Sequence, residues 1–250
     1  MDYSIIELNL NNIDNEDVVC LRGKKDTPFI NEKKLWMKKE FTNGLKFKKI
    51  MIEGRSWGFI EYIPGENAWR PVNADGYTVI HCHWIIGRYT QKGLGQILLN
   101  ECLEDSNGMK GVVTVIEDKH LAADYKFYSR RGFEIVDKAG KFVLMAKKFK
   151  DNYKDPEFTS STRTPPDFQG IYISYIRQCP YIEKSIEEME NVVKKYHLPY
   201  RIERLENSES VKSSTCPFGV CGIYYKGEFL THEPLYESKF VKILSKKDII

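Results

Sequence analysis

The chain has 250 residues, of which 42% are hydrophobic and 29% charged, as expected for a globular protein with a substantial core. A net charge of +3 is too small to indicate nucleic-acid binding, and no apolar run approaches the roughly 20 residues of a membrane span. Six cysteines and a polar start at Met1 to Ser4, without the pattern of a signal peptide, predict a cytoplasmic protein whose thiols are mostly reduced.

Alternating and helical hydrophobic patterns predict ten elements before residue 150. In chain order these are strand 4–10, helix 31–41, strands 47–52, 56–63 and 77–86, helix 94–104, strand 111–116, helix 122–131, and a hairpin of strands 133–137 and 141–146. Asn31 is placed to cap the first helix, and Gly132 to end the last one. This order predicts an α/β (α+β) fold in which helices flank a mixed sheet.

The composition changes once along the chain, between Lys150 and Gly170. This stretch is polar, contains three prolines and has neither helical nor strand periodicity, so it predicts a linker. We therefore expect a domain at 1–150, a linker at 151–168 and a smaller domain at 169–250, both of ordinary domain size.

A short glycine-bearing loop joins the long strand to the helix at 94–104. Gly93 and Gly95 flank Leu94, and the amides of residues 94–97 lie in the first helical turn, where the helix dipole favours an anion. Lys92 and Arg88 add positive charge nearby. The loop lacks the third glycine of a Rossmann site and the Gly-Lys-Ser/Thr of a P-loop. A tight turn that binds no ligand remains the alternative.

Two segments, "QKGLGQILL" and, some 30 residues later, "FYSRRGF", resemble the GCN5-related N-acetyltransferases (GNAT). The resemblance covers roughly residues 3 to 148, although Thr90 stands where that family has Arg or Gln. It implies acetyl-CoA as co-substrate, with Tyr128 near the thiolate of the leaving CoA. It further implies pantetheine contacts from the strand backbone of Trp84, Ile85 and Ile86. The pyrophosphate would be held by Gln91, Lys92, Gly93, Leu94, Gly95, Gln96 and Ile97.

Acetyl transfer also requires the amine to lose a proton, and three side chains are candidate bases. Glu61 is predicted on an apolar strand face that would raise its pKa. Three residues are expected on that face: Trp57, Phe59 and Ile63. His81 and His83 are predicted to share one face of the next strand, and histidine titrates near neutrality. Each side chain has an ordinary structural alternative, and no further ligands accompany the histidines, so no metal site is expected.

The long irregular connection between these two strands carries aromatic residues, as functional loops often do. Tyr62 and Trp69 are candidates for the walls of an acceptor pocket. A plain hairpin excursion would have the same appearance, and nothing in this connection identifies the amine.

The part from residue 169 onward predicts a strand, a helix, a strand, a hairpin turned at Lys226-Gly227 and a last helix. It resembles a thioredoxin-like, glutaredoxin-type domain and the YoaP-like domain found behind acetyltransferase domains. Cys179 at the helix start is expected to have a lowered pKa, but Ile182 occupies the position that would complete Cys-x-x-Cys. The resemblance places Cys216 close to Cys179, with Cys221 within reach. A disulfide, a soft-metal site or idle buried thiols remain open.

Together these features predict an acetyl-CoA-dependent N-acetyltransferase that acts on a primary amine of a small molecule or peptide, as a monomer or homodimer, without nucleic-acid or membrane partners. The alternative is a redox-active or metal(loid)-sensing protein that acts through the thioredoxin-like domain.

Overall fold

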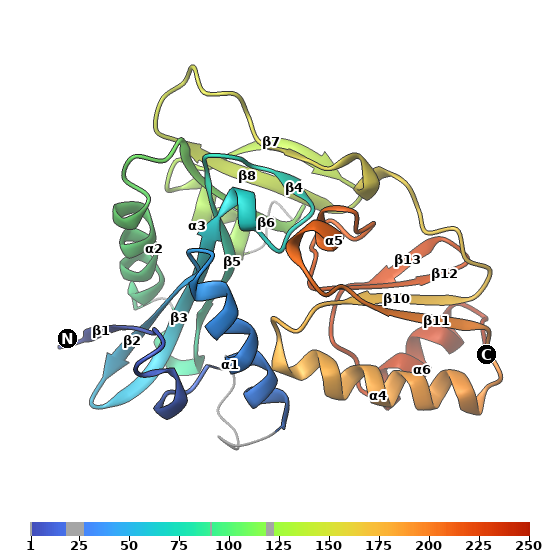
Figure 1. Ribbon diagram of the computed structural model, residues 1–250. Coiled ribbons are helices and arrows are strands. Elements are labelled where there is room, and N and C mark those ends of the chain that lie inside the picture. The colour runs from blue at the N-terminus through green and yellow to red at the C-terminus, as the bar shows by residue number, and fades with distance from the viewer. Residues whose placement is uncertain (1, 19–27, 91, 119–122) are drawn as a thin grey trace.

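The computed structural model describes residues 2–18, 28–90, 92–118 and 123–250. A seven-stranded sheet occupies one side of the molecule and a four-stranded sheet the other (Figure 1). The large sheet has the order β1-β2-β3-β5-β6-β8-β7, in which β5 and β6 run parallel and the other neighbours antiparallel. Its strands are β1 (Ser4–Glu7), β2 (Lys46–Ile52), β3 (Arg55–Pro64), β5 (Thr78–Ile85), β6 (Gly111–Glu117), β7 (Glu134–Ala139) and β8 (Phe142–Lys148). The expectation of a mixed sheet is confirmed.

Helices cover both faces of the large sheet, which is how α/β proteins bury a two-sided sheet. Helix α1 (Pro28–Phe41) packs on one face, and α2 (Leu94–Asp105) and α3 (Ala123–Ser129) pack on the other. The buried side of α2 comprises Leu94, Leu98, Leu99 and Cys102. The start of α1 was predicted wrongly, because this helix already begins at Pro28 and Asn31 lies inside it.

The smaller sheet has the order β11-β10-β12-β13, with α4 and α6 packed together below it in Figure 1. The strands are β10 (Ile171–Tyr175), β11 (Tyr200–Arg204), β12 (Cys221–Tyr225) and β13 (Glu228–Thr231), and the helices are α4 (Pro180–Lys195), α5 (Ser208–Lys212) and α6 (Glu237–Lys246). Strand β10 pairs parallel to β11 and antiparallel to β12. Lys226 and Gly227 turn the β12–β13 hairpin with positive φ angles of 48° and 80°, as predicted.

The polar connection is tied to the first part of the chain more closely than its composition indicated, through a separate two-stranded sheet. Strand β9 (Glu157–Phe158) pairs with β4 (Val72–Asn73), and Phe158 is buried. One cluster of buried apolar residues extends from α1 through the large sheet into the smaller sheet. The two sheets therefore share a core in addition to the chain that joins them.

Strand β5 contains the irregularity that shapes the site. Opposite β3, Ile80 pairs with Tyr62 and Cys82 with Glu61, so His81 is an extra residue and forms a β-bulge. On its other edge β5 pairs with β6 only from Thr78 to Ile80, although both strands continue. Within the described residues, the two strands therefore diverge beyond the bulge and leave one edge of β5 unpaired.

Among the described helices, none combines the length and the apolar character that crossing a membrane requires.

Candidate active site

The N-terminus of α2 lies beside the diverging strands and presents backbone donors. Gly93 precedes the helix with a left-handed φ of 83°, and its carbonyl accepts the amides of Gln96 (3.0 Å) and Ile97 (3.2 Å). The described residues offer no acceptor to the amides of Gly93, Leu94 and Gly95. Three adjacent N–H groups are thus available to an anion. Of the four amides predicted to be free, those of Gln96 and Ile97 are already engaged.

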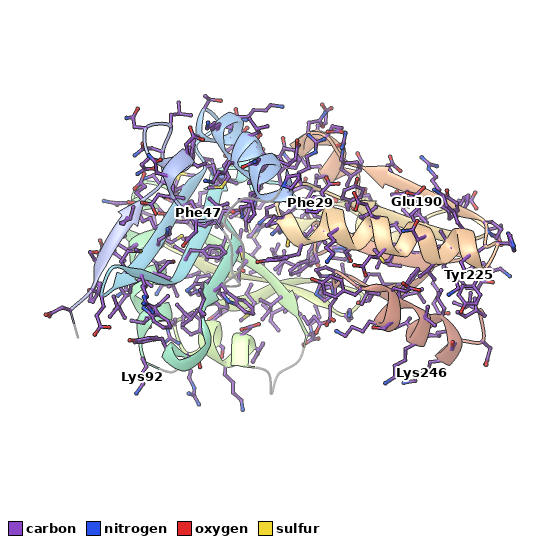
Figure 2. The ribbon with its side chains drawn as sticks, turned by 90° about the horizontal axis from the view of Figure 1, so that it is seen from below. Phe29, Phe47, Lys92, Glu190, Tyr225 and Lys246 are labelled. Atoms are coloured by element: carbon purple, nitrogen blue, oxygen red, sulfur yellow. The ribbon has the colours of Figure 1, made fainter. Side chains whose placement is uncertain are left out.

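Two other residues predicted to hold the pyrophosphate contribute little that can be described. Gln91 lies outside the described residues. Lys92 is exposed and points away from the protein at the edge of the view in Figure 2.

Arg131 is a cation at this helix start that the sequence analysis did not single out. Its Nε donates to Gln96 Oε1, its guanidinium donates to the Phe127 carbonyl at 2.6 Å, and it stacks 3.8 Å from the Phe127 ring centre. The second arginine of "FYSRRGF" was the available signal. Arg131 places a fixed positive charge next to the free amides, where it would favour a phosphate.

Tyr128 and His83 form a hydrogen-bonded pair on the same face of the sheet. Tyr128 Oη lies 3.1 Å from His83 Nδ1, and both rings pack against Phe127. Burial lowers the pKa of His83 to about 4, with Gly95 and Arg131 as smaller influences, so its ring is neutral near pH 7. Burial raises the pKa of Tyr128 far above its usual value, so the phenol retains its proton. The pair therefore combines a protonated phenol with an uncharged imidazole.

Glu61 and His81 lie on the opposite face, with Lys33 of α1. Lys33 Nζ lies 2.9 Å from Glu61 Oε2, and His81 Nδ1 lies 3.5 Å from Glu61 Oε1. His81 Nε2 accepts the Trp69 amide at 3.0 Å, so a neutral ring carries its proton on the nitrogen that faces Glu61. All three side chains are almost completely buried.

The expected basicity of Glu61 is wrong. Burial alone would raise the pKa of this carboxyl, but the charge of Lys33 and the neighbouring His81 hold it at about 2. Burial also lowers the pKa of His81 to about 4, against the opposing effect of Glu61. Glu61 is thus a permanently charged partner of Lys33 and too weak a base to take a proton from an ammonium group.

The expectation that His81 and His83 share a face is also wrong, and the bulge is the reason. An extra residue in one strand reverses the alternation beyond it, so His81 faces α1 while His83 faces α3. A second irregularity in the β2–β3 pairing separates Trp57 from Phe59, and Trp57 belongs to the α2 side.

The two proposed pocket walls do not come together either. Trp69 and Tyr62 are both buried, in the cores on opposite faces of the sheet. Trp69 packs edge-on against Trp36 with ring centres 5.5 Å apart, and the Tyr62 hydroxyl donates to Asp105 at 2.5 Å. Both side chains therefore have structural partners.

The β5 backbone matches the predicted pantetheine edge in part. Trp84 and Ile85 lie in β5 beyond its last pairing with β6, and the Trp84 side chain is exposed. Ile86 lies after the strand and donates its amide to the Trp57 carbonyl at 2.8 Å. Among the described residues, 83–85 of β5 thus have no strand partner on the side of β6.

The low pKa values of the two histidines predict how stability depends on pH. Each pKa is about 4 in the folded chain, against about 6.5 when unfolded, so the unfolded chain binds more protons between these values. Their contribution is complete above pH 6.5 and is lost as the pH falls towards 4. We expect His83→Gln to reduce the slope of the free energy of unfolding between pH 4.5 and 6 by up to one proton, about 1.4 kcal/mol per pH unit. Urea unfolding across this range measures the slope, and a slope equal to that of the wild type would contradict the burial of a neutral His83.

Cys179, Cys216 and Cys221, the three cysteines of the C-terminal part, are free thiols. Burial raises the pKa of Cys179, although the amides of Tyr181 and Ile182 act in the opposite direction, so the lowered pKa expected at a helix start is wrong. Burial likewise raises the pKa of Cys216 to about 11, and its Sγ donates to the Cys221 carbonyl at 3.1 Å. Among the described residues, no group of three or more potential ligands has the arrangement of a metal site. These thiols are protonated at neutral pH, which disfavours nucleophilic chemistry.

Comparisons with known proteins agree with this reading of the chain. The uncharacterized N-acetyltransferase YoaP of Bacillus subtilis (strain 168) is 31% identical over 247 residues, which cover 96% of this chain and 98% of that protein. The YoaP-like family model matches residues 199–242. Two solved structures are more distant, each 18% identical and covering 60% of this chain and all of the solved chain: the PaiA N-acetyltransferase of Thermoplasma acidophilum in complex with coenzyme A (TM-score 0.46), and a streptothricin acetyltransferase, described as putative, of Bacillus anthracis str. Ames in complex with acetyl coenzyme A (TM-score 0.40).

The mixed sheet with helices on both faces and the near full-length relative define the class as GNAT-type N-acetyltransferase. Within that class, the chain belongs to the YoaP family.

Proposed function

We propose that this protein transfers the acetyl group of acetyl-CoA to a primary amine of a small molecule or peptide. The observation that carries the proposal is the free amides of Gly93, Leu94 and Gly95 at the start of α2, next to the unpaired edge of β5. Family membership supports the reaction type, and the names of the two solved relatives mention coenzyme A or acetyl coenzyme A.

The residues present fit the successive parts of a CoA thioester. The three amides and Arg131 would hold the diphosphate, because both are preorganised donors for an anion. The edge of residues 83–85 that faces away from β3 would pair with the amides of the pantetheine arm, as an added strand does. Gly95 packs closely against the neighbouring rings, because a Cβ at this position would lie 3.3 Å from Phe127 and 3.6 Å from His83. The absence of a side chain there keeps the backbone of the helix start accessible to a ligand.

Tyr128 is proposed as the general acid that gives a proton to the departing thiolate. Its phenol is protonated, and neutral His83 fixes the position of the hydroxyl through the 3.1 Å contact. The reaction forms a C–N bond and breaks the C–S bond, and the nitrogen loses one proton as the sulfur gains one. An acceptor that enters as an ammonium releases a further proton.

Glu61, His81 and His83 have pKa values of about 2, 4 and 4, so none of them holds a proton from an ammonium group at neutral pH. We therefore assign the role of general base to none of them. The amine would reach the thioester after losing this proton to water.

We also propose the division into a transferase domain at 1–150, a connection at 151–168 and a thioredoxin-like domain at 169–250. Support comes from the order of elements after residue 169, in which a parallel β-α-β unit precedes an antiparallel hairpin and a helix. A cytoplasmic monomer or homodimer fits this proposal.

A negative charge introduced at position 93 offers a direct test of the diphosphate site. A Cβ at Gly93 would meet no atom within 4 Å, and Asp and Asn tolerate its left-handed backbone better than other side chains. Gly93→Asp would place a carboxylate beside the diphosphate. We expect it to weaken acetyl-CoA binding at least about tenfold, whereas Gly93→Asn, of the same shape and uncharged, should have a much smaller effect. Isothermal titration measures both; equal affinities for the two variants, or no binding by the wild type, would refute the site.

A further inference from the structure

A buried arginine connects the smaller sheet to the bulge of β5. Arg70 is 2% exposed, and its guanidinium donates to the Trp69 carbonyl (2.7 Å), to Gln178 Oε1 (2.7 Å) and to the carbonyl of His81. It also lies 5.6 Å from the ring centre of Phe218. Gln178 and Phe218 come from the C-terminal part of the chain, and His81 is the extra residue of the bulge.

Because the buried guanidinium of Arg70 is charged, the oxygen atoms that accept its hydrogen bonds are needed to stabilise it. Burial lowers its pKa to about 10, so the group is still positive near pH 7. In the part of the chain that the structure describes, no carboxylate lies within ion-pair distance of its guanidinium. Neutral oxygen atoms therefore accept the hydrogen bonds of this buried charge, while the Glu61 carboxylate stabilises it without a direct contact. The loss of one of these oxygens is costly because a charged donor is left unsatisfied.

Gln178 is held where it can supply that oxygen. It is 4% exposed and lies just before α4, whose buried stripe packs the helix into the shared core. Nearby, Arg177 bonds across to Glu32 of α1 at 3.1 Å, so the start of α4 is fixed against the first part of the chain. Figure 2 shows the start of α4 lying next to the N-terminal turn of α1, at Phe29.

We propose that Gln178 and Arg70 are positioning residues of the transferase. Gln178 orients the guanidinium, which holds the His81 carbonyl in the bulge and so keeps β5 apart from β6. The C-terminal part then supports the acetyl-CoA site indirectly, through Arg70, without contacting acetyl-CoA itself. The expected effect on acetyl-CoA kinetics rests on the proposed function, whereas the expected effect on the β5 bulge rests on the contacts alone.

Two substitutions that nearly preserve the size of the Gln178 side chain distinguish the effect of its hydrogen-bond acceptor from the effect of its shape. Gln178→Met removes the oxygen, and Gln178→Glu keeps one and adds a charge opposite to that of Arg70. We expect Gln178→Met to raise the KM for acetyl-CoA about tenfold, the effect of losing one hydrogen bond to a charged group, and Gln178→Glu to stay within about threefold of the wild type. Arg163→Ala is the control, because Arg163 joins the connection to Asp137 at 2.7 Å on a distant strand.

Hydrogen–deuterium exchange of the peptide spanning residues 78–86 is the readout that does not depend on activity. Exchange should become faster in Gln178→Met and remain unchanged in Gln178→Glu and Arg163→Ala. Unchanged exchange in Gln178→Met overturns the proposal, and so does faster exchange with an unchanged affinity for acetyl-CoA. If the wild type does not bind acetyl-CoA but Gln178→Met still exchanges faster, the proposed function fails while the link between Gln178 and the bulge stands.

Discussion

Replacing Tyr128 by Phe is expected to lower kcat by about two to four orders of magnitude, the usual contribution of a general acid. The substitution removes the hydroxyl, which is the only group of the Tyr128 side chain that can donate a proton. Its oxygen lies 3.1 Å from His83 Nδ1, on the strand that diverges from β6. Its ring packs against Phe127 and Phe133, and Phe would retain these contacts. The affinity for acetyl-CoA should therefore change little, because the diphosphate donors lie on α2.

Steady-state kinetics with a panel of amines, together with titration of acetyl-CoA, measures the two quantities separately. Tyr200→Phe is the matched control, since the hydroxyl of Tyr200 in β11 donates to Glu190 of α4 at 3.1 Å, away from the candidate site. A kcat for Tyr128→Phe within about threefold of that of the control would rule out the acid role and leave Tyr128 as a packing residue.

The second large effect concerns stability. Lys33→Met is expected to reduce the free energy of unfolding by about 3–5 kcal/mol, because it leaves the Glu61 carboxylate buried without its cation. The double variant Lys33→Met/Glu61→Leu removes both charges and should recover most of this loss. Urea unfolding of the two variants and the wild type measures the difference.

Lys38→Met supplies the comparison on the same helix. Lys38 pairs with Asp14 at 2.7 Å, but this pair is exposed, and such pairs contribute about 0–1 kcal/mol. If Lys33→Met and Lys38→Met proved equally mild, the pairing of Lys33 with Glu61 would not be the buried ion pair described above.

Local patterns predicted the parts of the site that depend on local sequence. The glycines around Leu94 and the apolar spacing of α2 indicated the helix start, and "FYSRRGF" placed Tyr128. The faces of β5 were not predictable, because a strict two-residue alternation has no signal for the extra residue at His81. Tertiary packing alone reveals that Lys33, in the charged run of α1, is buried and fixes the pKa of Glu61.

Contacts between residues far apart in the sequence could not be predicted either, because they also depend on tertiary packing. Arg70 and Gln178 are 108 positions apart and each looks like an ordinary polar residue of a loop. Their meeting depends on how the two sheets are placed, which no periodicity describes. Similarly, Cys179 occupies a helix start that favours a thiolate, but its burial has the larger effect on its pKa.

The apolar cluster shared by the two sheets has a consequence for how this family can change. A cut within 151–168 would expose buried side chains on both pieces, so neither half is an interchangeable module. Variation in chain length is better tolerated at exposed hairpin tips such as Gly54, where added atoms would meet nothing, than at the apparent boundary between the halves.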